Sequence, residues 1–249
     1  MIGFVIVSHS EALAQAAVDL GMQMIHGEAP AVRIASGADG SFGTDAAAIA
    51  DAIDALADAD GVLIITDLGS AVLSSELALD LRTSTVAVRI SDGPFVEGIT
   101  AGLVRAAAGG GLDDVANEVS TALAAKQAHA PAASADAPMP PAASDAPAGA
   151  LGSDASVEAL LRNPMGLHSR PAALVVKAVG AFDTDVSIAN LTTGAGPASA
   201  LSMIGLLALG AGGGATVRIS ASGPDAAAAV ETVRRLVDDG FGELDQAPA

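Results

Sequence analysis

A histidine in the second half of the chain stands in a setting suited to accept a phosphoryl group. His168 lies between a turn-prone Asn-Pro pair and Pro171, which opens an apolar run. Because proline is tolerated in a helix's first turn, we expect His168 at a helix amino terminus, beside unpaired N–H donors that bind anions. Neutral imidazole is a nucleophile near pH 7, and Arg170 can clamp a phosphate. The spacing indicates either a phosphohistidine steadied by Arg170 or a helix-capping histidine beside a surface arginine.

A second histidine, His9, follows a short apolar segment. Residues 2–7 are typical of a strand buried on both faces of a parallel sheet, and helical periodicity begins soon after them. His9 is therefore also expected at a helix amino terminus, flanked by the hydroxyls of Ser8 and Ser10. A polar Ser-His-Ser directly after a core strand packs poorly unless it lines a pocket. We therefore favour a functional role for His9.

The elements expected to position His9 alternate between strand and helix. Strand-like runs fall at residues 2–7, 32–35, 61–66 and 85–90, with helical periodicity between them. This alternation predicts an α/β fold for residues 1–125, with a mainly parallel, doubly wound sheet. Ligands of such sheets gather beyond the carboxyl ends of the strands. The loops there contain further candidates for stabilising a phosphate, namely Thr44, Asp67, Gly69 and Ser70. Taken singly, Thr44, Asp67 and Ser70 are better explained as helix-capping residues.

The second half of the chain divides into a linker and a smaller domain. Residues 126–153 consist mostly of Ala, Pro, Ser, Asp and Gly, which predicts a disordered linker. Such a tether would keep two sites at roughly millimolar mutual concentration. Residues 154–245 predict an α+β domain with strands near 156–162, 185–190 and 215–221, helices near 169–180, 200–208 and 224–238, and a short strand or turn after the second strand. Ser202 falls in the first turn of the short helix, where a structural role suffices.

Composition excludes several classes of function. The net charge is −18 with only two lysines, so no basic stripe is present for a nucleic-acid partner. The chain has no cysteine, and its four histidines are scattered, so we expect no disulfide and no metal site. The amino terminus lacks a basic segment, and no apolar stretch is long enough to span a bilayer. We expect a cytoplasmic protein without membrane insertion.

Residues 155–240 resemble HPr, the histidine phosphocarrier of the bacterial phosphotransferase system. The blocks that carry the resemblance are Asn163–Ala173, Ser202–Gly210 and Ile219–Gly223. The resemblance implies a βαββαβα open-faced sandwich, with His168 as the phosphorylated residue and Arg170 steadying the phosphate. It also makes Ser202 a candidate for regulatory phosphorylation.

Residues 1–125 resemble the first domain of the DhaM family, which has the mannose-type IIA fold. The matching blocks are Phe4–Ser10, Gly43–Ala46, Ala59–Leu63, Asp67–Ala71 with Leu73 and Ser74, and Val96–Gly98. A sugar-transport IIA domain would be expected to carry a Trp-Gly-Gly-Ser-Pro-like loop after the third strand, whereas this chain has no tryptophan. The order of the two domains also resembles DhaM, the phosphotransfer subunit of dihydroxyacetone kinases that depend on phosphoenolpyruvate (PEP).

The DhaM resemblance implies a relay in which the chain acts as a PEP–glycerone phosphotransferase subunit, active only with partner proteins. Enzyme I, expected as a separate chain because nothing follows Ala249, would phosphorylate His168 from PEP, and His168 would then phosphorylate His9. His9 would rephosphorylate ADP held by a DhaL-like subunit, whose ATP serves a DhaK-like, dihydroxyacetone-binding subunit. No cofactor bound by this chain is implied. A homodimer through the first domain is expected from the resemblance alone. The alternatives are a IIA–HPr component that phosphorylates a sugar permease and a regulatory phosphocarrier module.

Overall fold

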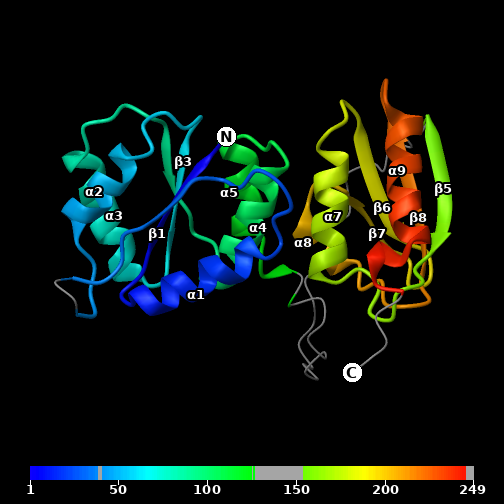
Figure 1. The fold of residues 1–249 in the computed structure, drawn as a ribbon, viewed down its shortest axis with the longest axis horizontal. Helices are drawn as coiled ribbons and strands as arrows, with labels where there is room; N and C mark the ends of the chain where they lie inside the picture. The colour runs from blue at the N-terminus through cyan, green and yellow to red at the C-terminus, as the bar shows by residue number, and fades with distance from the viewer. Residues whose placement is uncertain (39–40, 125, 127–153, 245–249) are drawn as a thin grey trace, which may run out of the picture.

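The computed structural model describes residues 1–38, 41–124, 126 and 154–244. They form two folded units, each built on its own sheet, and the units lie side by side (Figure 1). Apart from Lys126, the predicted linker lies outside the described residues. Within the described part of the chain, no helix is long and apolar enough to cross a membrane.

The first unit contains a four-stranded parallel sheet in the order β2-β1-β3-β4. Its elements, in chain order, are β1 (Gly3–Val7), α1 (Glu11–Met22), β2 (Val32–Ile34), α2 (Ala46–Asp54), β3 (Val62–Thr66), α3 (Gly69–Leu81), β4 (Val88–Ile90), α4 (Phe95–Ala107) and α5 (Leu112–Ser120). The central strands β1 and β3 are buried along their whole length, as their continuous apolar sequences predict.

Helices cover both faces of this sheet because the side chains of each strand alternate in direction. Phe4 and Ile6 of β1 pack in one apolar cluster with residues of α1, α4 and α5. Val5 and Val7 of the same strand pack in a second cluster with residues of α2 and α3. The predicted doubly wound α/β fold is therefore confirmed.

The second unit contains a four-stranded antiparallel sheet in the order β5-β8-β6-β7. Its elements are β5 (Ala155–Leu160), α7 (Ser169–Val179), β6 (Asp185–Asn190), β7 (Ala195–Ser199), α8 (Met203–Ala208), β8 (Thr216–Ser222) and α9 (Ala226–Asp238), followed by the short 3-10 helix η1 (Gly240–Gly242). The order βαββαβα confirms the predicted open-faced sandwich. The segment left open as a strand or turn is the edge strand β7.

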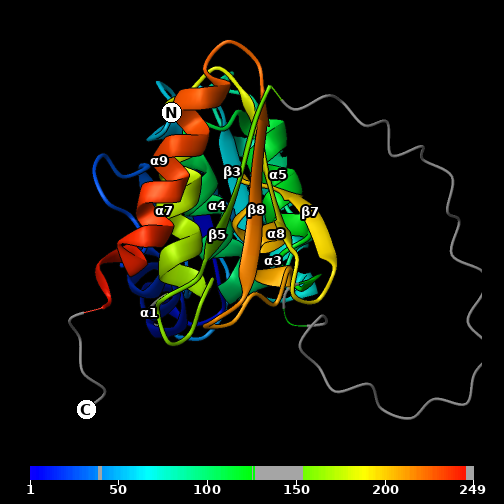
Figure 2. The same ribbon diagram turned by 90° about the vertical axis from the view of Figure 1, so that its right-hand side faces the viewer.

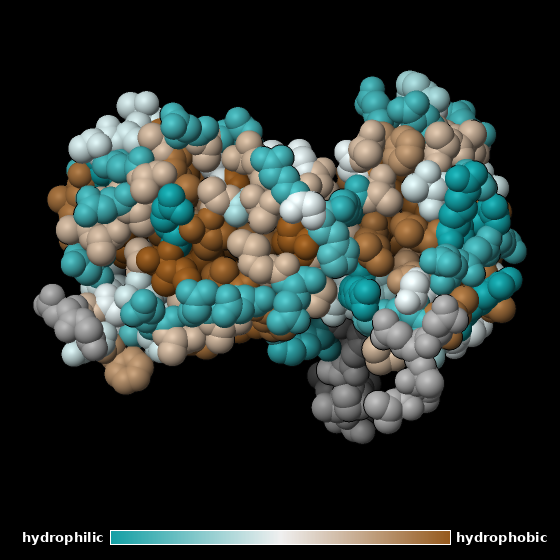
Figure 3. All heavy atoms as spheres, viewed as in Figure 1, coloured by the Kyte–Doolittle hydropathy of each residue, from teal (hydrophilic) through white to brown (hydrophobic). Residues whose placement is uncertain are grey.

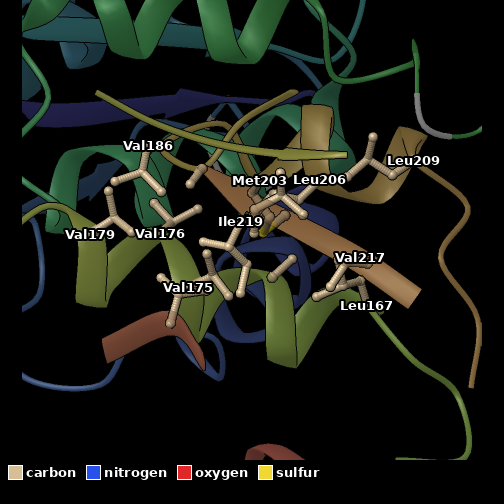
Figure 4. Packing of buried hydrophobic residues seen from close by; sticks show 14 of the residues in the cluster. Leu167, Val175, Val176, Val179, Val186, Met203, Leu206, Leu209, Val217 and Ile219 are labelled. Atoms are coloured by element: carbon tan, nitrogen blue, oxygen red, sulfur yellow. The ribbon is translucent and has the colours of Figure 1, made fainter. Parts of the chain in front are cut away.

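The core of the second unit lies between the sheet and its helices. Alternate residues of β8, among them Val217 and Ile219, are buried, as expected for a sheet with one covered face. Figure 4 shows Ile219 near Val175 and Val176 of α7, and Val217 beside Leu167. Figure 2 shows α7 and α9 together on one side of the strands β5 and β8. This packing fixes the amino terminus of α7, where His168 lies.

Candidate functional site

His9 lies at the carboxyl edge of the parallel sheet, directly after β1. Ser10 is the N-cap of α1, and its hydroxyl accepts a hydrogen bond from the N–H of Leu13 at 3.3 Å. The predicted position of His9 before a helix is therefore confirmed. Strands β1 and β3 pair in parallel, with Val7 opposite Thr66. This register places the residues that follow each strand, His9 and Asp67, next to one another.

Asp67 holds both the ring and the backbone of His9. Its Oδ1 lies 3.0 Å from His9 Nδ1, and its Oδ2 accepts hydrogen bonds from the His9 N–H at 2.8 Å and the Ser8 hydroxyl at 2.9 Å. Burial alone would raise the pKa of Asp67, but these hydrogen bonds keep it below its ordinary value. The ionised carboxylate favours the tautomer with hydrogen on Nδ1, which leaves the lone pair of the neutral ring on Nε2.

The free nitrogen of His9 faces the beginning of a second helix. Nε2 lies 2.9 Å from the hydroxyl of Ser70, the second residue of α3. Leu68 is the N-cap of α3 and makes no side-chain capping bond, so the N–H groups of Gly69 and Ser70 are first-turn donors without a cap. A Cβ atom at Gly69 would meet no atom within 4 Å. Open space and oriented donors therefore lie where a phosphate on Nε2 would need them.

A glycine-rich loop between β2 and α2, which includes Gly37 and Gly43, closes the other side of this site. The N–H of Gly43 donates to the His9 carbonyl at 3.0 Å, and the N–H of Gly37 donates to the Ser8 carbonyl at 3.1 Å. The loop bounds an open pocket of about 270 Å³, lined by His9, Ser10, Glu11, Ser36, Gly37, Ser41 and Phe42. The sequence analysis singled out none of the serines of this loop.

The remaining residues predicted around His9 have other partners. Ser8 is fully buried and lies behind Asp67. The Thr44 hydroxyl pairs with that of Ser74 at 2.8 Å, which ties the glycine-rich loop to α3. The structure thus brings Asp67 and Ser70 to the His9 ring, Ser8 to Asp67, and Thr44 to the loop that frames the pocket.

His168 is the N-cap residue of α7, in extended conformation, and the helix begins at Ser169. This confirms the predicted helix start, with Pro171 in the first turn. The N–H groups of Ser169 and Arg170 lie in the first turn of this helix, where no earlier helical carbonyl is available to them. Arg170 is exposed, as a residue that meets a phosphate on His168 should be. The site therefore offers two first-turn amides beside the imidazole, and the Arg170 charge helps to lower the pKa of Glu243, which contacts the ring.

Glu243, which follows η1, contacts the His168 ring although the two residues are 75 positions apart in the sequence. Its two carboxylate oxygens lie 3.0 and 3.1 Å from His168 Nε2, and Asn163 Nδ2 donates to one of them at 2.9 Å. Burial alone would raise the pKa of Glu243, but hydrogen bonds from Asn163 and His168 keep it below its ordinary value. The ionised carboxylate favours hydrogen on Nε2 and leaves the neutral ring's lone pair on Nδ1. Sequence reasoning missed Glu243 because nothing near it in the chain marks it.

The turn before His168 depends on a glycine. Gly166 has φ +65°, and a Cβ atom there would clash with the carbonyl oxygen of Ala211. Its carbonyl accepts hydrogen bonds from the His168 N–H at 3.0 Å and from Asn163 Nδ2 at 2.8 Å. The close approach of two backbone segments therefore fixes the orientation of His168.

Ser202 is the N-cap of α8, and its hydroxyl accepts a hydrogen bond from the Gly205 N–H at 2.8 Å. This is the structural role that its position in the sequence already explained. A regulatory role for Ser202 stays a prediction.

Two family models match the chain, one in each folded unit. The model described as PTS system fructose IIA component, EIIA-man, matches residues 3–116, and the model described as PTS HPr component phosphorylation site matches residues 155–239. Each match spans all the strands of one sheet. The chain therefore joins a domain of the EIIA-man type to a domain of the HPr type, the two components that these models describe.

Over its whole length the chain is similar to the phosphoryl donor subunit DhaM of PEP-dependent dihydroxyacetone kinase. It is 38% identical to that of Klebsiella michiganensis and 40% identical to that of Pantoea ananatis, over 100% and 98% of this chain. The same alignments cover 53% and 51% of the two relatives, so the chain spans about half the length of the curated relatives it matches. The solved structure of HPr-C-His from Thermoanaerobacter tengcongensis is 31% identical, with 36% of this chain and 97% of that one covered and a TM-score of 0.33. The similarity to DhaM therefore extends over this whole chain and over about half of each relative.

Proposed function

We propose that the chain is a phosphohistidine relay subunit that carries phosphoryl groups from enzyme I through His168 to His9. The observation that carries this proposal is the complementary state of the two rings. A carboxylate holds Nε2 of His168 and Nδ1 of His9, which leaves Nδ1 of His168 and Nε2 of His9 as nucleophiles. Each ring also stands at a helix amino terminus, where oriented N–H groups stabilise an anion.

The first step charges His168. The lone pair of its Nδ1 attacks the phosphorus of a phosphohistidine on enzyme I, and the P–N bond to the donor breaks. The proton on Nε2 stays in its hydrogen bond to Glu243, which stabilises the positive charge that the ring gains. The Arg170 guanidinium and the first-turn amides of α7 neutralise the equatorial oxygens of the transferring group.

The second step charges His9. Its Nε2 attacks the phosphorus held by His168, the P–N bond to His168 breaks, and the electron pair returns to Nδ1 of that ring. Asp67 stabilises the positive charge on the His9 ring through the Nδ1–H, as Glu243 does for His168. The Ser70 hydroxyl and the amides of Gly69 and Ser70 bind the phosphate.

The acceptor after His9 is proposed from the relatives. Their name, phosphoryl donor subunit of PEP-dependent dihydroxyacetone kinase, favours delivery to a kinase partner over delivery to a sugar permease. An oxygen of the terminal phosphate of ADP, bound by a DhaL-like subunit, would attack the phosphorus on His9 and form ATP. The ATP would then phosphorylate dihydroxyacetone on a DhaK-like subunit. The predicted homodimer and cytoplasmic location belong to this proposal.

Labelling with enzyme I and radioactive PEP, without separate HPr, tests the proposal. We expect the His9→Ala chain to take label at His168, and the His168→Ala chain to take none at either site. ADP-loaded DhaL-like subunit should discharge the wild-type chain, whereas a sugar-permease domain should not. Label on His9 at the wild-type rate in the His168→Ala chain would contradict the order of transfer.

A further inference from the structure

A carboxylate of the first unit closes onto the second unit. Glu118 of α5 is only 7% exposed, and its Oε1 accepts a hydrogen bond from the N–H of Ile204 in α8 at 2.8 Å. Burial raises the pKa of Glu118, while the bond from Ile204 opposes that shift. The Ser202 side chain and the charge of Arg105, which itself pairs with Asp114, also oppose that rise in pKa. Burying a carboxylate is costly unless such partners satisfy it. The cost of burying the Glu118 carboxylate therefore offsets much of the stabilisation that its hydrogen bond provides. A contact with such a small net energy is suited to open reversibly.

Close apolar packing accompanies this contact. Ala101 and Val104 of α4 lie in one buried cluster with Met203 and Ile204 of α8. The units also approach closely where α4 and α7 end. A Cβ atom at Gly180, the C-cap of α7, would lie 2.6 Å from the carbonyl oxygen of Ala108, the C-cap of α4. The two units therefore touch from α8 to the end of α7, and the space-filling view shows a notch between them beyond the contact (Figure 3).

The surface of the second unit that the first unit covers lies beside His168. Its neighbour Ser169 lines a groove of about 300 Å³ between the units, together with Leu20, Met24, Val96, Glu97, Thr100, Ala122, Lys126, Met203, Ile204 and Leu207. A protein that delivers a phosphoryl group to His168 must cover the surface around it. Specific interfaces bury roughly 800 Å² per partner, a patch about 16 Å in radius. The first unit therefore occupies part of the surface that a donor needs.

The closed arrangement also separates the two histidines. His9 precedes α1, whereas Leu20 and Met24, at and just beyond the other end of that helix, share the groove with Ser169. The twelve residues of α1 span about 18 Å. Phosphoryl transfer requires reacting atoms about 3–3.5 Å apart. In this arrangement His168 therefore lies too far from His9 for direct phosphoryl transfer.

We propose that the contact between Glu118 and α8 is a clasp that holds the second unit in a closed resting arrangement. In this arrangement, phosphorylation of His168 by enzyme I is slowed, and the clasp must open before His168 can reach His9. The inference rests on the proposed relay function. It assigns to Glu118 and to the α4–α8 contact a regulatory role outside both phosphorylation sites.

The test uses the full chain with His9→Ala as background, so that label enters at His168 alone. Two variants open the clasp independently. Glu118→Ala removes the acceptor, and Gly180→Leu wedges the units apart at a position that touches neither His168 nor Glu118. Glu76→Ala removes an exposed acid on α3 and is the control. The readouts are the initial rate of labelling by enzyme I and PEP, and hydrogen exchange of the Ile204 amide.

We expect both opening variants to label about tenfold faster than the control. Exchange of the Ile204 amide should also quicken in Gly180→Leu, where its acceptor is still present. Equal or slower labelling in both variants, with quickened exchange, would overturn the clasp as a brake. Unchanged exchange in Gly180→Leu would overturn the clasp as a contact that opens. Absence of label in every chain would refute the relay itself, which separates that failure from failure of the clasp.

Discussion

Replacing Asp67 with asparagine tests how the His9 ring is activated. The carboxylate lies 3.0 Å from Nδ1 and fixes the hydrogen there. In Asp67→Asn the amide group can itself donate to Nδ1, which favours hydrogen on Nε2 and removes the nucleophilic lone pair. The variant also cannot stabilise the positive charge that the ring gains when the P–N bond forms. We therefore expect slower transfer from His168 to His9, with His168 labelling unchanged.

The magnitude follows from the contact that is lost. A hydrogen bond to a charged group contributes about 1.5–3 kcal/mol. At 1.4 kcal/mol for each factor of ten, the rate constant for transfer should fall roughly 10- to 150-fold. The asparagine amide can still accept the hydrogen bonds that Asp67 receives from the Ser8 hydroxyl and the His9 N–H, so the first unit should remain folded.

Rapid mixing with alkaline quench, which preserves the P–N bond, gives the rate at which label reaches His9. Asp80→Asn, an exposed change on α3 of the same unit, is the matched control. Thermal unfolding of each variant checks that the fold is intact. Transfer at the wild-type rate in a folded Asp67→Asn chain would refute the assignment of Nε2 as the nucleophile.

Further predictions concern the second site and stability. Glu243→Gln should slow labelling of His168 by enzyme I about tenfold or more, because one hydrogen bond to a charged group is lost; nitrogen NMR should place the wild-type phosphate on Nδ1, and phosphate on Nε2 would contradict this reading. Hydrogen bonds from the Thr83 hydroxyl and from the N–H groups of Ser84 and Thr83 lower the pKa of Asp54 to about 2. The contribution of Asp54 to stability is therefore full above about pH 4 and is lost as the pH falls through about 2. The difference in melting temperature between wild type and Asp54→Asn should therefore shrink on acidification across that range, and a constant difference would refute it. Gly166→Ala should destabilise the second unit by about 1–3 kcal/mol in denaturant unfolding, because alanine is strained at its positive φ and its Cβ has no room; an unchanged midpoint would contradict this.

Local sequence signals predicted where the two histidines would lie. Pro171 is compatible with the first turn of a helix and Ser10 is a good N-cap, so each signal acts within one turn of the residue it positions. The burial of β1 and β3 followed from their continuous apolar runs, and parallel pairing then brought Asp67 and Ser70 to His9. This part of the site could be predicted because strand topology converts sequence order into proximity at one edge of the sheet.

What the sequence by itself determined is therefore the class of fold, the places of the two histidines and the helix termini behind them. Which ring nitrogen is free was decided by tertiary structure, since Glu243 reaches His168 from 75 residues away. The closure of Glu118 onto Ile204, across 86 residues and two folded units, was likewise absent from any local pattern. The physical reason is that helix starts and strands depend on neighbours along the chain. The partner of a buried carboxylate depends instead on how separately folded segments pack.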